Sequence, residues 1–203
     1  MFKPFALAVL AAGAIVAPAQ AKDAGFGGVK IGAIVGYDNA NLEYEGVDAD
    51  KGGALYGVTA GYDMDLGRAI VGVEVEAADA STRWRTYDID VTGDSAKLAA
   101  GRDLYVGARV GLPISGSLLA YAKGGYTNAR AKLSYNDGAG FTASDSDTLD
   151  GWRAGGGVEL SNAGTFARLE YRYSDYGDYK YAGFNTGLSV SRQQVALTGG
   201  FKF

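Results

Sequence analysis

Charged residues that could take part in catalysis recur at alternate positions in several apolar segments of this chain. Glu74 and Glu76 are paired carboxylates, a residue type used in general acid–base catalysis. The set interleaves acidic and basic residues, and an interior charge is costly unless a partner of opposite sign lies beside it. We therefore interpret the set as a structural network of ion pairs and not as a catalytic site. Its members are Glu74, Glu76, Arg109, Lys123, Arg153, Glu159, Arg168, Glu170 and Arg172.

Three further segments carry residue types found in binding sites. The acidic residues within 43–45 and 145–147 offer oxygen ligands suited to a hard cation, but their spacing does not match an EF-hand loop. The three consecutive glycines at 155–157 stand within an alternating segment and not before a helix, which argues against a phosphate-binding loop. We interpret the acidic segments as solvated loops and predict no catalytic residues, no metal site and no cofactor.

The alternation itself indicates which elements position the charges. In the segment 192–203, one row of alternate residues is apolar and ends in two aromatic residues, whereas the other row is small or polar. A period of two is that of a β-strand, whose successive side chains point to opposite faces. The apolar row is Val195, Leu197, Gly199, Phe201 and Phe203.

Seven earlier segments show the same alternation, with the charged row on one face and the apolar row on the other. Their links alternate between long polar segments and short turns, and short links join neighbouring antiparallel strands. With the segment 192–203, the sequence predicts eight strands in up-and-down antiparallel order. The other strands are 29–37, 56–64, 71–77, 103–112, 118–126, 152–160 and 167–173; the long links are 38–53, 79–98, 131–150 and 175–189; the short links are 65–68, 113–117 and 162–164.

Aromatic residues expected on the outer face lie near the strand ends. Amphipathic rings favour the boundary between water and lipid, and a membrane-spanning barrel strand needs about 9–11 residues. The pattern therefore predicts an eight-stranded antiparallel up-and-down transmembrane β-barrel. The aromatic residues are Tyr37, Tyr56, Tyr126, Trp152 and Tyr173 toward the long links, and Tyr62, Phe166 and Phe203 toward the turns.

The N-terminal segment has the features of an export signal. Lys3 precedes an apolar run at residues 5–16, and Ala-Gln-Ala at 19–21 resembles a signal-peptidase site. The run is too short for a transmembrane helix. We therefore predict a signal peptide at 1–21 and one barrel domain at 22–203. The chain has no cysteine and a net charge of −4, so we expect no disulfides and no nucleic-acid partner.

Three segments give the chain a specific family resemblance: Arg-Val-Gly at 109–111, Leu-Ala-Tyr-Ala-Lys-Gly-Gly-Tyr at 119–126 and Leu-Glu-Tyr-Arg-Tyr at 169–173. They resemble the small bacterial outer-membrane β-barrel proteins of the Omp25/Omp31 group, a porin family related in fold to the OmpA barrel. The resemblance implies a place in the outer membrane, in contact with lipid and lipopolysaccharide. It also implies that Phe201 and Phe203 are the insertion signal read by the barrel-assembly machinery.

The resemblance also bears on activity. Enzymes among outer-membrane barrels rely on a catalytic histidine, and this chain has none. We therefore expect a non-enzymatic protein, favoured as a monomer, with a structural or surface role in the cell envelope. No peptidoglycan-binding domain is expected after the barrel. The alternatives are a narrow porin-type channel and, less favoured, a surface protein that binds a ligand such as haem or mediates adhesion. Arg-Trp-Arg at 83–85 is a candidate contact for lipopolysaccharide phosphate or a host surface.

Turn lengths predict the register inside the barrel. If Leu160 opposes Ala167, then Glu159 faces Arg168, and glycines face two other charged residues, as Gly157–Glu170 and Gly155–Arg172 pairs. A similar alignment at the second turn predicts Gly107 opposite Lys123. Eight strands enclose a lumen just wide enough for side chains to fill, so we expect a plugged cylinder and not an aqueous channel.

Overall fold

The chain forms one closed sheet of antiparallel strands. A computed structural model describes residues 25–44, 47–87, 95–136, 142–162, 164–181 and 184–203. The signal peptide predicted at 1–21 lies outside this part of the chain. The strands are β1 (Gly28–Tyr44), β2 (Val47–Asp65), β3 (Ile70–Ala80), β4 (Arg83–Tyr87), β5 (Ser95–Pro113), β6 (Leu118–Asn136), β7 (Thr142–Asn162), β8 (Thr165–Tyr181) and β9 (Phe184–Lys202).

The strand order closes the sheet into a barrel with eight strand positions around its wall. Every neighbouring pair in the order β3-β2-β1-β9-β8-β7-β6-β5-β4 is hydrogen-bonded, and β3 also pairs with β5. Strands β3 and β4 occupy one position, because both pair with β5 and only Ser81 and Thr82 separate them. The predicted eight-stranded antiparallel barrel is therefore confirmed. None of the described residues belongs to a helix that is long and apolar enough to cross a membrane.

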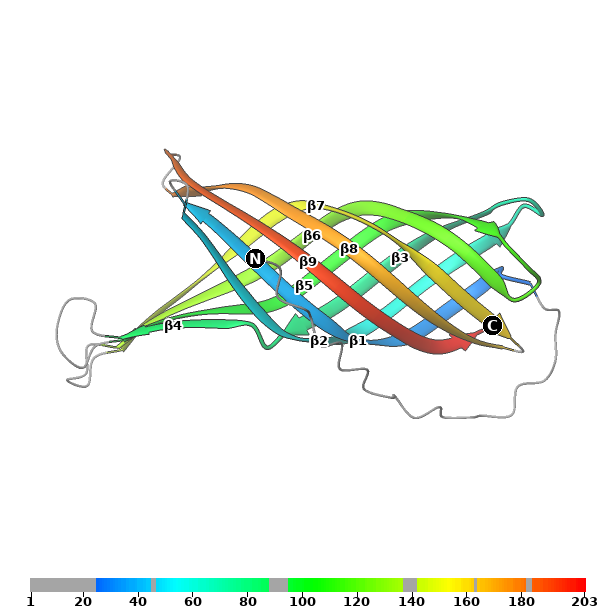
Figure 1. Ribbon diagram of the computed structural model, residues 1–203, viewed down its shortest axis with the longest axis horizontal. Coiled ribbons are helices and arrows are strands. Elements are labelled where there is room, and N and C mark those ends of the chain that lie inside the picture. Colours follow the sequence, from blue (N-terminus) through cyan, green and yellow to red (C-terminus); the bar gives the residue numbers. More distant parts are fainter. Residues whose placement is uncertain (1–24, 45–46, 88–94, 137–141, 163, 182–183) are drawn as a thin grey trace, which may run out of the picture.

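The two ends of the barrel differ (Figure 1). The hairpins β1–β2, β4–β5, β6–β7 and β8–β9 extend from one end, whereas the links β2–β3, β5–β6 and β7–β8 and the C-terminus lie at the other. We call these the hairpin end and the turn end. In the first turn Gly67 has a φ of 83°, which disfavours other residues, and Leu66 donates a 2.9 Å hydrogen bond to the carbonyl of Ala69.

The predicted long polar links are wrong over much of their length. β1 continues through Asp38 to Tyr44 and β2 begins at Val47, where we expected a loop from 38 to 53. The strands of the other three hairpins likewise extend into most of the remaining predicted long links. Antiparallel pairing satisfies the backbone hydrogen bonds of such hairpins, and polar side chains are compatible with strands that have water on both sides. Alternation of hydrophobicity is then lost although the strand persists.

The side-chain pattern is the reverse of that in a soluble protein. In β3, Val71, Val73 and Val75 are exposed, whereas Glu74 and Glu76 are buried inside the barrel. Val73 is 61% exposed and its neighbour Glu74 only 3%. Such an arrangement is stable when the outer face lies in hydrocarbon and the ions pair with one another within the lumen.

Closure of the barrel predicts a specific cross-link. Val35 on β1 faces Leu197 on β9, and directly opposed strand residues lie within the Cα separation that a disulfide needs. Because the chain has no cysteine, we expect the V35C/L197C variant to oxidise to one intramolecular disulfide, visible as a mobility change on a denaturing gel.

The V35C/L169C variant serves as the control. Leu169 pairs with Leu197 on the next strand, so it is one strand farther from Val35. It should stay reduced under the same oxidant. Cross-linking of V35C/L169C alone would contradict the observed pairing of the first and last strands.

Candidate functional site: the ion-paired lumen

All nine charged residues that the sequence singled out are buried in the lumen. The structure adds Lys30, Asp38, Asp63, Asp103 and Arg192, which sequence reasoning did not include. Among the described residues the buried charges therefore number seven cations and seven carboxylates, and each takes part in at least one ion pair. The cations are Lys30, Arg109, Lys123, Arg153, Arg168, Arg172 and Arg192; the carboxylates are Asp38, Asp63, Glu74, Glu76, Asp103, Glu159 and Glu170.

Near the turn end, the network is centred on Glu159 from β7. Its carboxylate contacts Arg109 at 2.7 Å and Arg168 at 2.8 Å, and it also accepts a hydrogen bond from Lys30. Asp63 pairs with Lys30 at 2.6 Å and with Arg109 at 3.5 Å. These residues come from five strands, so the layer joins opposite sides of the wall.

The middle layer is centred on Lys123 from β6. Its ammonium lies 2.5 Å from Glu76 and 2.9 Å from both Glu74 and Glu170. Tyr121 donates a 2.8 Å hydrogen bond to Glu170. One cation thus pairs with three carboxylates, two from β3 and one from β8.

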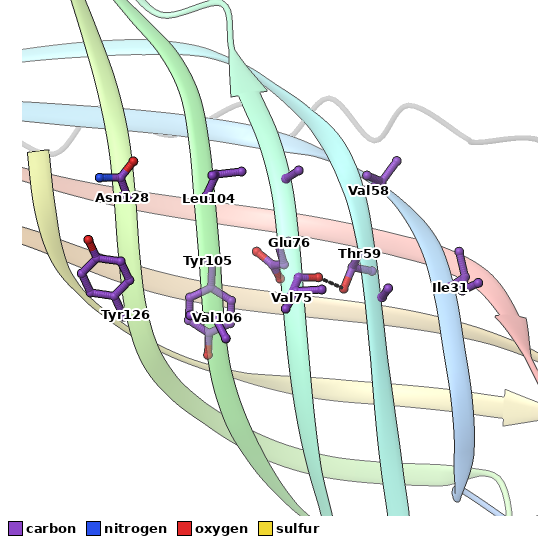
Figure 2. Close-up of a pocket in the computed structure, with 12 residues that line it drawn as sticks. Ile31, Val58, Thr59, Val75, Glu76, Leu104, Tyr105, Val106, Tyr126 and Asn128 are labelled. Atoms are coloured by element: carbon purple, nitrogen blue, oxygen red, sulfur yellow. Dashed lines mark hydrogen bonds between the residues drawn. The ribbon is translucent and has the colours of Figure 1, made fainter. Parts of the chain in front are cut away.

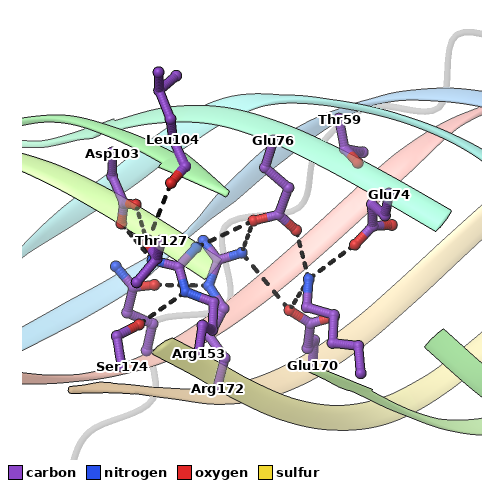
Figure 3. Close-up of polar contacts among 12 residues, drawn as sticks. Thr59, Glu74, Glu76, Asp103, Leu104, Thr127, Arg153, Glu170, Arg172 and Ser174 are labelled. Atoms are coloured by element: carbon purple, nitrogen blue, oxygen red, sulfur yellow. Dashed lines mark hydrogen bonds and ion pairs between the residues drawn. The ribbon is translucent and has the colours of Figure 1, made fainter. Parts of the chain in front are cut away.

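Arginines link the middle layer to the hairpin end (Figure 3). Arg172 lies 2.6 Å from Glu76, and Arg153 bridges Glu76 at 3.3 Å and Asp103 at 2.5 Å. Arg192 extends this series of ion pairs, because its guanidinium lies 3.1 Å from the Asp103 carboxylate and 2.8 Å from the Asp38 carboxylate. Arg168 also pairs with Glu74 and so joins the turn-end layer to the middle layer, which makes the ion pairs one connected network along the lumen.

Aromatic rings fill the space between these charges. The Arg109 guanidinium lies 4.4 Å from the centre of the Tyr121 ring, and the Lys123 ammonium lies 4.8 Å from that of Tyr105. Cations over ring faces are stabilised by the ring quadrupole. Tyr105 and Tyr121 are buried.

The register at the third turn is confirmed. Glu159 pairs with Arg168, Gly157 with Glu170 and Gly155 with Arg172. A glycine opposite a long charged side chain leaves room for that side chain to cross the lumen.

The register expected at the second turn is wrong. Lys123 pairs with Arg109, and Gly107 pairs with Gly125. β5 and β6 stay paired as far as Pro113 and Leu119, so the register is shifted by two residues and each side chain keeps its face. The glycine beside Lys123 is Gly155, on the other neighbouring strand.

Phe166 is a second correction. We expected it in the outer aromatic row near the turns, but it is 4% exposed and points inward. Ala167 is exposed, so alternation places Phe166 in the lumen. The Arg168 guanidinium lies 4.7 Å from the centre of its ring. Phe201 and Phe203 do face outward, and the backbone of Phe203 exchanges two hydrogen bonds with Val29 of β1.

An apolar cluster lies at the turn end of the lumen. Phe26, just before β1, is buried against Ile70 and Leu119, which stand at the starts of β3 and β6.

Replacing a buried phenylalanine with alanine lowers the free energy of unfolding by about 3–5 kcal/mol. We expect F26A to lower the free energy of unfolding in urea by about 3 kcal/mol, whereas L66A, at an exposed turn residue, should change it by under about 0.5 kcal/mol. Equal effects of the two variants would show that Phe26 does not stabilise this end.

The remaining sequence candidates gain no support as sites. The glycines at 155–157 lie within β7, as expected. The side chains of 43–45, 83–85 and 145–147 lie outside the part of the chain whose side chains the structure describes. Among the residues that are described, no group of three or more acidic side chains is placed to hold a metal ion.

Comparison with known proteins agrees with this architecture. The family description "Outer membrane protein beta-barrel domain" matches residues 5–191. The chain belongs to this family of outer-membrane β-barrel proteins. Like other members of the family, this barrel resides in the bacterial outer membrane.

This outer-membrane barrel is 28% identical to the 25 kDa outer-membrane immunogenic protein of Brucella abortus, over 93% of the chain and 82% of the relative. It is 28% identical to the 31 kDa outer-membrane immunogenic protein of Brucella melitensis, over 64% of the chain and 57% of that relative.

Solved structures share the fold of this outer-membrane barrel. Ail, the attachment invasion locus protein of Yersinia pestis, matches with a TM-score of 0.52 and 16% identity, over 87% of this chain and 99% of that one. The outer membrane protein OprG of Pseudomonas aeruginosa matches with a TM-score of 0.52 and 15% identity, over 90% and 99% of the two chains. At such low identities the likeness establishes the fold alone.

Proposed function

We propose that the protein is a non-enzymatic component of the outer membrane, in which the closed barrel has a structural role and the hairpin end is a surface exposed to the outside. The observation that supports this proposal is the balanced network of seven cations and seven carboxylates inside the barrel. A barrel of eight strands has room for little more than its own side chains. Filled with paired ions, the lumen is a rigid core that joins opposite walls.

The lumen chemistry also supports the absence of enzymatic activity. A general acid or base must be free to exchange a proton with a substrate. Glu74 and Glu76, the paired carboxylates, are instead bound to cations and buried. The chain has neither histidine nor cysteine, so two common nucleophile and base types are missing from its sequence.

A narrow channel is the second candidate. Its supporting observation is that the lumen is lined by polar and charged side chains along the barrel, as a path for ions requires. Conduction would need the ion pairs to separate, which is costly for charges that are this deeply buried. The structural role is therefore the favoured proposal.

For assembly, we propose that the outward aromatic residues Phe201 and Phe203 act as the signal read by the barrel-assembly machinery. They lie on β9 and at its end, where the backbone pairs with β1. The strand that carries them is thus the one that closes the barrel.

A deletion strain tests the proposed role. We expect it to become sensitive to detergents and to retain wild-type uptake of small solutes, because a structural component supports the envelope without carrying solutes across it. Complementation by the wild-type chain should restore resistance. Loss of solute uptake with unchanged detergent resistance would favour the channel.

A further inference from the structure

The outer wall of the barrel is hollowed on its β2, β3 and β5 side (Figure 2). A cavity of 650 Å³ opens between exposed side chains, with two alanines among larger neighbours. Ala77 pairs with Val58 on one side and Leu104 on the other, so a short side chain stands between two long ones. The lining of the hollow includes the outward-facing apolar residues Val58, Ala60, Val75, Ala77, Leu104 and Val106.

The hollow continues toward the turn end. A second cavity, of 360 Å³, shares Ala60, Val75 and Val106 with the first and extends to Tyr62 and Val73. Together the two cavities form a furrow, which we call the outer furrow. It runs along the part of the wall that faces hydrocarbon, where an acyl chain is the natural occupant.

The hairpin end of the outer furrow is polar. Tyr126 and Asn128 line it, and both donate hydrogen bonds of 2.5 Å to Asp150 on β7. Trp152 lies beside Tyr126 and is 52% exposed. The ring centres of Trp152 and Tyr173 are 5.7 Å apart. Exposed tyrosine and tryptophan mark the depth at which lipid headgroups begin.

Two arginines lie just beyond this boundary. The pairing of β5 with β6 shifts between Ala100 and Asp103, and this bulge places Arg102 next to the strand segment that carries Arg130. Arg102 donates a 3.2 Å hydrogen bond to the Asn128 side chain. Both arginines are exposed, and neither forms an ion pair with a described residue. We call Arg102 and Arg130 the arginine pair.

Charge complementarity identifies the kind of molecule that fits. Guanidinium groups from two adjacent strand segments can donate several charge-assisted hydrogen bonds to one phosphate. Asp150 lies nearby, but its carboxylate already accepts the hydrogen bonds of Tyr126 and Asn128. The long hairpins of outer-membrane barrels face the exterior, so the arginine pair and the hairpin-end part of the outer furrow belong to the outer leaflet.

We propose that the outer furrow and the arginine pair bind one phosphorylated lipid of the lipid A class. One acyl chain lies along Ala77 and Ala60, and one phosphate lies between Arg102 and Arg130. The site is on the outer wall, so it does not depend on whether the lumen is closed.

Native mass spectrometry of the folded barrel with added diphosphoryl lipid A tests the phosphate contact. We expect R102Q/R130Q to retain the lipid about tenfold less than the wild type, because charge-assisted hydrogen bonds are lost. R68Q, at an exposed arginine in the first turn, should bind as the wild type does. Unchanged binding by R102Q/R130Q would overturn the proposal.

The acyl contact has its own test. A77L fills the outer furrow, whereas A122L adds the same volume on an exposed position of β6 that does not line it. We expect A77L to weaken lipid A retention several-fold and A122L to leave it unchanged. Equal effects of A77L and A122L would show that no acyl chain occupies the furrow. Equal retention of phosphatidylcholine and lipid A would show ordinary boundary lipid and would also overturn the site.

Discussion

Replacing Lys123 with methionine is expected to destabilise the barrel by about 3–5 kcal/mol, the usual result of removing one partner from a buried ion pair. The ammonium of Lys123 contacts Glu74, Glu76 and Glu170 within 2.9 Å. Methionine keeps most of the volume but supplies no charge. Among the described residues, Glu170 then keeps one ion pair, the 3.6 Å contact with Arg172, beside its hydrogen bond from Tyr121. The carboxylates then repel one another in a lumen with little water to screen them.

Urea titration of the folded protein measures this effect. The fraction that migrates as folded on an unheated gel is followed against urea for the wild type, K123M and K51M. Lys51 is exposed on β2, so K51M should change the free energy of unfolding by under about 0.5 kcal/mol. If K123M is as stable as K51M, the middle layer of the network does not hold the barrel together.

Removing two arginines from the lumen is expected to give the largest change in conductance. Arg153 and Arg172 cross the lumen between the middle layer and the hairpin end. In R153A/R172A, Glu76 keeps its contact with Lys123 and Asp103 keeps its contact with Arg192. The barrel should therefore still fold, while two long side chains no longer fill its lumen.

Single-channel recording in planar bilayers checks this prediction. We expect R153A/R172A to show steady openings that the wild type lacks, with a preference for cations because two positive charges are gone. The control, R68A/R130A, removes two exposed arginines outside the lumen and should conduct no more than the wild type. No gain of conductance in R153A/R172A would mean that these arginines do not seal the lumen.

Much of the wall of the barrel could be predicted from alternation alone. Glu74 and Glu76 point inward because Val73 and Val75, which alternate with them, face lipid. The same rule places Lys30, Asp63 and Asp103 in the lumen, on strands that were predicted correctly. They stand in the charged rows of those segments, but the predicted set did not include them. Arg192 follows the alternation of the predicted strand 192–203, and Asp38 follows that of β1 when the predicted strand is extended.

The contacts across the lumen could not be predicted in this way. Lys30 meets Glu159 although 129 positions separate them, because the tilt and stagger of the whole barrel decide which strands face each other. The second turn shows the same limit on a local scale. Its conformation places Lys123 opposite Arg109, two residues from the predicted partner Gly107. Phe26 precedes the first strand and belongs to no periodic pattern, so only the closed barrel places it.

The central claim is that paired charges close the lumen, and the conductance of the unmodified protein in planar bilayers tests it most directly. With the fourteen buried charges paired, the account predicts no steady conductance and no entry of sugars into liposomes that contain the folded barrel. Stable conductance of the unmodified protein, together with sugar entry, would contradict it.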